Sequence, residues 1–306
     1  MSYSYHLKIL KKEILIYNFM YWKNFSFILS IFFLFFSVFS IGFFGFTWSI
    51  DFTGGSIFQI HFEKLIEIYN VSDMLNSIGL YNSKSSYFGG IHNIIIRFPH
   101  FSNISIEDLS HKILIFFNEN LKNQCEIISS EYIGSSIDNN LLIFFFLALF
   151  FSILCTSFYI FLRFSWYLSI GIILSLFHDI LLILGCISFL HIEISPIIVV
   201  SLLSIIGYSI NDSIVISDRI RENIKKFKYL SFFNILNLSL TQIYARTIMT
   251  SATTFSVAAI SYYFGNEMIK NFSLTMMIGI FLGTLSSIYV SSSLSFQLYK
   301  KLKIMK

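Results

Sequence analysis

Ionisable and amide side chains interrupt the most apolar stretches of this chain at a few positions. His178 and Asp179 lie near the middle of the run 166–190, and Asn211 and Asp212 lie within the run 196–216. Burying such groups in an apolar environment is costly, so their presence there is a hypothesis of function by default. An aspartate in such a place can take up and release a proton as helices move. The chemistry indicated is proton transfer.

A buried aspartate is stabilised by a basic partner, and the chain offers one. Arg246 is the only charged residue between Lys228 and Glu267, an interval much longer than one membrane span. An arginine on one helix that faces Asp212 on another would reduce the cost of burying both charges. The alternative, which stays open here, is that Arg246 lies at the membrane edge and extends its guanidinium to water.

Two other polar sites also have structural explanations. His178 and Asp179 could form a hydrogen bond between helices without any further role. Asp218 lies with Arg219, Arg221 and Glu222, and this group is typical of a solvated helix end on the positively charged side of a membrane protein. Both sites remain secondary candidates, and Asp212 is the hardest to explain by structure alone.

The composition requires a membrane protein. Of 306 residues, 55% are hydrophobic and only 12% are charged, whereas a soluble domain has about 25% charged residues. A helix that crosses a bilayer needs about 20 apolar residues. Six runs meet this length and predict six transmembrane helices, at 25–46, 141–162, 166–190, 196–216, 243–264 and 272–294.

Lysine and arginine in the short loops predict the orientation. The segments before the first run, after the second and fourth runs and after the sixth run are basic, whereas the opposite short loops hold only Lys270. We therefore expect both termini in the cytoplasm and the segment between the first and second runs on the outer side. The predicted parts are a cytoplasmic segment 1–24, helix 25–46, an outer domain 47–139, a five-helix domain 140–298 and a cytoplasmic tail 299–306.

The long segment between the first and second runs is predicted to fold outside the cytoplasm as an α+β domain. Strand patterns at 56–62, 85–88, 93–98 and 126–133 and helix patterns at 71–78 and 104–121 give the order βαββαβ, which is ferredoxin-like. Gly79 is expected to stop the first helix, Gly89 and Gly90 to form a hairpin turn, and Ser102 and Asn103 to precede the second helix. This fold hosts many functions, so it indicates none by itself.

Several function classes are not indicated. The three cysteines do not suggest a disulfide framework, and no His/Cys spacing predicts a metal site. The formal net charge of +4 is too small to suggest nucleic-acid binding. The apolar run after Lys23 is too long for a cleaved signal peptide and is expected to remain as a membrane anchor. We expect no cofactor and no enzymatic activity.

Motifs that span nearly the whole chain resemble SecF proteins of the SecD/SecF protein-export family. The stretch 48–55 reads Trp-Ser-Ile-Asp-Phe-Thr-Gly-Gly and follows the first apolar run directly. The single small outer domain and the Asn-Asp-Ser motif at 211–213 favour SecF over its partner SecD. The chain departs from the family at two turns, Gly134-Ser135 and Gly265-Asn266. The further matching stretches are 177–179, 206–215, 217–223, 246–247 with 250–251, 272–276 and 286–290.

The resemblance implies half of an RND-type transporter that pairs with SecD in a twelve-span complex. That complex would use the proton motive force to promote export of preproteins through SecYEG, with YajC and SecA as further partners. Asp212, Arg246 and Asn211 would belong to the proton path. Another RND-type exporter is the alternative. An intramembrane aspartyl protease is disfavoured, because the sequences around Asp179 and Asp212 lack the motif expected of such a protease. The junction to the outer domain would be formed by Asp51, Phe52, Thr53, Gly54 and Gly55.

Overall fold

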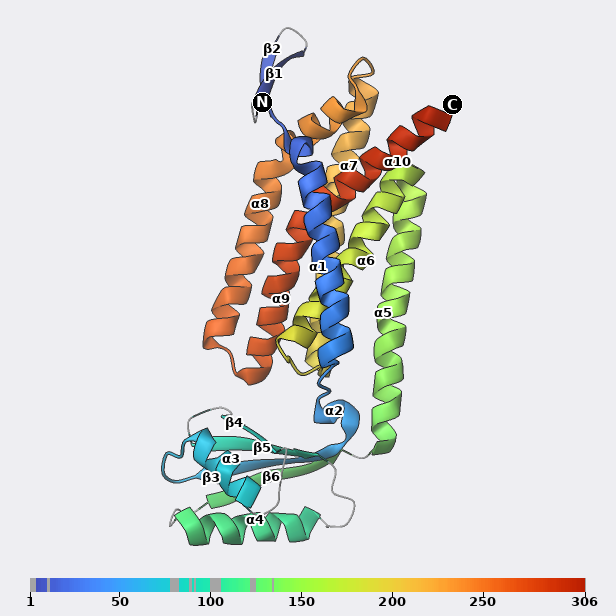
Figure 1. The fold of residues 1–306 in the computed structure, drawn as a ribbon. Coiled ribbons are helices and arrows are strands. Elements are labelled where there is room, and N and C mark those ends of the chain that lie inside the picture. Colours follow the sequence, from blue (N-terminus) through green and yellow to red (C-terminus); the bar gives the residue numbers. More distant parts are fainter. Residues whose placement is uncertain are drawn as a thin grey trace.

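The computed structural model describes residues 4–9, 12–77, 83–87, 90, 92–99, 106–121, 125–133 and 135–305. It consists of a bundle of long helices with a small α+β domain beyond one end of the bundle (Figure 1). Both chain termini lie at the opposite end of the bundle (Figure 1). The architecture is that of a polytopic helical membrane protein with one α+β domain outside the bundle.

The bundle contains the helices expected from the apolar runs. The last helix continues through a π-helical segment, η2, into α10. Five stretches in the described part of the chain are long and apolar enough to cross a membrane, and α8 is not among them. A sixth span at 243–264 therefore stays a prediction, although those residues are helical. The helices are α1 (Lys23–Phe44), α5 (Ser135–Arg163), α6 (Trp166–Phe189), α7 (Pro196–Lys226), α8 (Phe232–Phe264), α9 (Glu267–Leu285), η2 (Ser286–Ser291) and α10 (Ser292–Met305).

The helices differ in how deeply they are buried. The apolar windows of α1 and α5 are 11% buried, against 56% for α6 and α7, so α1 and α5 lie at the periphery. Close packing in the centre depends on small residues. Gly279 and Gly283 of α9 face Ile205 and Ser209 of α7, and a side chain at Gly279 would overlap Ile205. These two glycines form a G-x-x-x-G motif that lets α9 pack closely against α7.

The outer domain has the predicted βαββαβ order. Its four-stranded sheet is antiparallel with strand order β4-β5-β3-β6, which matches a ferredoxin-like split unit. The positions of Gly79, Gly89, Ser102 and Asn103 lie outside the described residues. The elements are β3 (Gly55–Phe62), α3 (Ile68–Ser77), β4 (Lys84–Tyr87), β5 (Asn93–Pro99), α4 (Ile106–Leu121) and β6 (Cys125–Ile133).

The domain has its own hydrophobic core between the sheet and the two helices. Alternate residues of β3, Phe58, Ile60 and Phe62, are buried because successive strand residues point to opposite faces. Helix α4 contributes residues four apart, among them Ile113 and Phe117. The neighbouring Phe116 is only partly buried.

The N-terminal segment before α1 contains regular structure that was not predicted from the sequence. It forms a hairpin of β1 (Ser4–Ile9) and β2 (Lys12–Tyr17), followed by a 3-10 turn, η1 (Phe19–Trp22). The segment is anchored on α8, where the Tyr17 amide donates to Thr241 Oγ1 at 3.1 Å and the Met20 amide donates to Asn237 Oδ1 at 2.9 Å. Polar residues in the first part of α8 thus bind the start of the chain.

Candidate functional site

The junction between α1 and the outer domain is a tight turn that needs its glycines. Ser49 caps the short helix α2 (Ile50–Thr53), and its hydroxyl also donates to Asp51 at 2.9 Å. Gly54 has φ +76°, which side-chain-bearing residues rarely adopt. A side chain at Gly55 would overlap the carbonyl oxygen of Phe98 in β5. Both glycines are therefore required by the backbone path.

The same junction is hydrogen-bonded to the loop between α6 and α7. The Ser49 amide donates to the Ile194 carbonyl at 2.9 Å, and the Ile194 amide donates to the Thr47 carbonyl at 2.8 Å. Phe52 is buried in the cluster that also contains Ile194. Because α7 begins at Pro196, two residues after Ile194, the junction is in direct contact with the outer end of the helix that carries Asp212.

Asp212 lies in the core of the bundle without a hydrogen-bond partner. Its side chain is 4% exposed, and among the described residues its Oδ2 has no hydrogen bond. A buried carboxylate without partners costs several kcal/mol. Such a group is stable only if it binds a proton or if a positive charge lies nearby.

Arg246 supplies positive charge to this region without touching the carboxylate. It lies on α8 and its Coulombic interaction reaches Asp212, but no ion pair joins the two in the described part of the chain. Its side chain is exposed on this single subunit. It lines a cavity of about 390 Å³ together with Asp218, Arg219 and Glu222. Arg246 thus lies near the part of α7 that follows Asp212, on an open face.

Asn211 does not share the buried environment of its neighbour. It lies on the exposed side of α7 in line with Ser204 and Gly207, since residues three and four apart share one face of a helix. Asn211 and Arg246 are both exposed, whereas Asp212 is covered. The three proton-path candidates therefore do not form one bonded cluster within this chain.

Asp179 is the centre of a hydrogen-bond network between the membrane helices. It is 2% exposed. Its Oδ2 accepts from Ser209 of α7 and Ser286 of η2, both at 2.7 Å, and its Oδ1 lies 3.1 Å from Nδ1 of His178. His178 Nε2 is 2.6 Å from Ser30 of α1. The expected bond between helices is present and joins four helical segments.

Asp218 belongs to a group of charges near the C-terminal end of α7. It is one-third exposed and pairs with Arg163 at 2.7 Å and with Arg221 at 3.3 Å. Arg219 pairs with Glu222 at 2.5 Å. Exposed pairs of this kind contribute about 0–1 kcal/mol each. These contacts fit the explanation of Asp218 as part of a solvated helix end.

The hydroxyl groups that bind the ionisable residues were not predicted from the sequence. Ser30, Ser209 and Ser286 complete the Asp179 network, and Ser251 of α8 bonds Thr284 of α9 at 2.8 Å. Serine and threonine are common in membrane helices, so their identity alone does not distinguish a ligand from a packing residue. The sequence feature that could have indicated a polar role for Ser209 is its position three residues before Asp212, on the same face of one helix.

Comparison with known proteins agrees with this geometry. A family model for the C-terminal region of the protein export membrane proteins SecD and SecF matches residues 114–301, and a second, for the SecD/SecF GG motif, matches residues 39–64. Protein translocase subunit SecF of Escherichia coli O157:H7 is 38% identical over 302 residues, which cover 98% of this chain and 94% of that relative. The chain belongs to the SecF proteins of the SecD/SecF family.

Other SecF relatives and two solved structures give the same result. SecF of Vibrio alginolyticus is 35% identical, over 95% of this chain and 92% of that protein. A crystal structure of SecDF, a translocon-associated membrane protein from Thermus thermophilus, matches 93% of this chain with a TM-score of 0.80 and 30% identity. SecDF in a super-membrane-facing form matches with a TM-score of 0.71 and 29% identity.

The chain corresponds to less than half of each SecDF chain. This chain spans 39% of the first SecDF structure and 40% of the second. The relatives are protein translocase subunits, which have a transport role. The family assignment makes this chain a multi-pass membrane protein, and in bacteria the membrane is the inner membrane.

Proposed function

We propose that this chain is the SecF subunit of a SecDF complex that uses the proton motive force to promote late steps of polypeptide export. Its direct partner is SecD, and the complex works with SecYEG, YajC and SecA on emerging preproteins. The observation that carries the proposal is the buried Asp212 carboxylate. Its Oδ2 has no hydrogen bond among the described residues, and it interacts electrostatically with Arg246. Asp212 takes up and releases the proton, and Arg246 stabilises its charged form.

The exposed polar faces of α7 and α8 support a partner in the membrane. Helix α7 exposes Ser204, Gly207 and Asn211, and α8 exposes Arg246 and Thr253. Small and polar residues in membrane helices favour contact with another helix over contact with lipid. A SecD helix packed here would cover Arg246 and complete the surroundings of Asp212.

The junction supports transmission of a helix movement to the outer domain. Ile194 binds the segment before α2 through two backbone hydrogen bonds, so a shift of the start of α7 moves the junction glycines and the sheet that begins at Gly55. One charge that crosses 100 mV yields about 2.3 kcal/mol. This energy suits a repeated small movement.

The rival functions have less support. A different RND-type exporter shares the buried charges, but the relatives identified are translocase subunits. An aspartyl protease needs two aspartates that act on one substrate, and here Asp179 and Asp212 differ in surroundings: the first is fully hydrogen-bonded and the second is not.

Crosslinking to SecD tests the proposed partner surface. We expect single cysteines at Ser204 or Thr253 to form crosslinks with SecD in membranes, because both positions lie on the exposed polar faces. A cysteine at Phe161, which is 56% exposed on α5, is the control and should not crosslink. Crosslinking from Phe161 but from neither polar face would contradict the proposed surface.

Thiol labelling tests the proposed orientation. In intact cells, an impermeant thiol reagent should label a cysteine at Tyr69, which is 73% exposed in the outer domain, and should not label one at Lys225. The native Cys125 is buried in the domain core, and burial raises the pKa of its thiol, so it adds little background since the thiolate is the reactive form. Labelling at Lys225 alone would reverse the orientation.

A further inference from the structure

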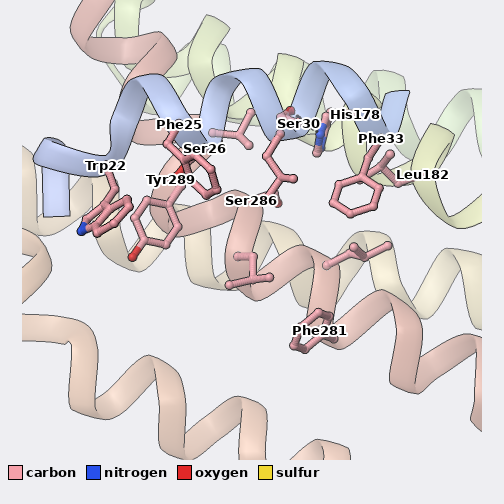
Figure 2. A pocket seen from close by; sticks show the side chains of 14 residues that line it. Trp22, Phe25, Ser26, Ser30, Phe33, His178, Leu182, Phe281, Ser286 and Tyr289 are labelled. Carbon is pink, nitrogen blue, oxygen red and sulfur yellow. Dashed lines mark hydrogen bonds between the residues drawn. The ribbon is translucent and has the colours of Figure 1, made fainter. Parts of the chain in front are cut away.

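A cleft on the side of the bundle reaches the His178–Asp179 pair. It has a volume of about 480 Å³ and lies between α1, α6 and the α9–η2 helix. It extends along α1 from Trp22 to Phe33, which is about 16 Å at 1.5 Å per residue. Figure 2 shows the His178 ring beside Ser30 at this cleft, with aromatic side chains along its length.

The cleft is apolar except at a few positions. Its polar side chains are those of Trp22, Ser26, Ser30, His178, Ser286 and Tyr289. A cavity holds water when it is roomy enough and offers two to four polar partners. Ser26, Ser30 and Tyr289 offer hydroxyl groups to water along the cleft, whereas the Ser286 hydroxyl donates to Asp179. Trp22 places one end of the cleft at the end of the bundle where α1 starts.

The hydrogen bonds of His178 fit both of its protonation states. When the ring is neutral, Nδ1–H donates to Asp179 Oδ1 and Nε2 accepts from the Ser30 hydroxyl. When the ring is protonated, Nε2–H donates to Ser30 Oγ, because a hydroxyl is both donor and acceptor. The distances of 3.1 Å and 2.6 Å suit either arrangement. His178 can therefore gain a proton without loss of a hydrogen bond.

Asp179 is the acidic partner of the His178 ring. Asp179 is buried, and its other contacts are two neutral serine hydroxyls. Among the described residues, the only basic group in contact with this carboxylate is His178. A buried ion pair with full hydrogen bonding is less costly than a lone buried carboxylate. Protonation of His178 converts a site of net charge −1 into a neutral pair.

Few other ionisable groups are near enough to compete. On the elements packed against His178, Asp212 lies on α7 one turn from Ser209, and Tyr289 of η2 lines the same cleft. Lys23 at the start of α1 is held over the Phe296 ring, 4.3 Å from its centre. The other charges lie near the ends of their helices: Asp138 and Arg163 on α5, Glu267 and Lys270 on α9, and Lys300, Lys301 and Lys303 on α10.

We propose that His178 is a second proton-binding group of this chain, distinct from Asp212, and that it exchanges its proton with water in the cleft between α1, α6 and η2. A hydronium ion gives its proton to Nε2 and leaves as water, while Nδ1 keeps its proton and Ser30 changes from donor to acceptor. Asp179 is the positioning residue, since it holds the ring and balances its charge. Ser209 connects this site to α7 three residues before Asp212.

Nuclear magnetic resonance of histidine tests this directly and does not depend on transport. The full chain, with its seven histidines isotopically labelled, is reconstituted with SecD in lipid nanodiscs, and the His178 signal is assigned by its loss in His178→Gln. We expect the His178 signal to change to that of an imidazolium as the pH is lowered. This change should be absent in Asp179→Asn. A neutral His178 throughout, or the same change in Asp179→Asn, would overturn the proposal.

A transport measurement separates proton binding from a purely structural bond. His178→Gln retains a polar side chain but cannot become cationic, so the pH profile of uncoupler-sensitive export should change shape relative to wild type. A structural role would lower only the amount of folded protein and leave the profile unchanged, and that result would also overturn the proposal. The inference builds on the proposed proton-driven function. Since the resonance measurement needs no transport, failure of either one can be recognised separately.

Discussion

Replacement of Asp212 by asparagine is expected to abolish the part of protein export that depends on the proton motive force. Asp212→Asn keeps the size and polarity of the side chain and removes its ionisation. The variant should insert and fold, because removal of a buried, unpartnered charge lowers the cost of burial. The measurement is the rate of secreted-protein maturation with and without an uncoupler, at matched membrane levels. We expect the uncoupler-sensitive fraction to fall to about zero.

The matched control is the same change one and a half turns further along the same helix. Asp218→Asn removes a carboxylate that is ion-paired with Arg163 and one-third exposed. Pairs of this kind contribute about 0–1 kcal/mol, so export should remain close to wild type. Full uncoupler-sensitive export in Asp212→Asn would remove Asp212 from the proton path and leave it a structural residue.

Replacement of Arg246 by alanine is expected to have a similarly large effect. The guanidinium supplies the positive charge that acts on the Asp212 carboxylate, and its loss leaves a buried charge uncompensated. The deprotonated state then becomes too unfavourable for the cycle, so uncoupler-sensitive export should be lost. Lys225→Ala is the control, because Lys225 is exposed at the end of α7 and its removal should have little effect.

Replacement by lysine shows how Arg246 acts. Lysine keeps the charge but lacks the planar group that can form two parallel hydrogen bonds. Partial export by Arg246→Lys indicates a role as a point charge, and complete loss indicates a bidentate contact with the partner subunit. If Arg246→Ala exports at the wild-type rate and remains sensitive to the uncoupler, Arg246 is a membrane-edge residue.

The fold was largely predictable because its two parts have simple patterns. Long apolar runs predict membrane helices, and alternation at residues 56–62 predicts β3, since strand residues alternate between core and surface. The N-terminal hairpin was not predicted. Its partners, Asn237 and Thr241, are more than 200 residues away in the sequence. The π-helical turn at Ser286 has no local signal in the sequence either.

The site was predictable in its charged residues and not in its connections. Burial cost identified Asp179, His178 and Asp212. No sequence rule states that Asp179 is bound by three side chains while Asp212 is bound by none, because this depends on how α6, α7 and η2 rotate against one another. Exposure of Arg246 was also unpredictable, since its cover belongs to another chain in the proposed complex.

Infrared difference spectroscopy of the SecDF complex in lipid vesicles tests the central claim most directly. The spectrum is recorded as the pH on one side of the membrane is changed, and the carboxylic acid C=O band reports protonated aspartate. Surface carboxylates contribute bands that all variants share. One further band should appear on acidification in wild type and in Asp218→Asn, and this band should be missing in Asp212→Asn. Persistence of this further band in Asp212→Asn would show that Asp212 does not carry the proton.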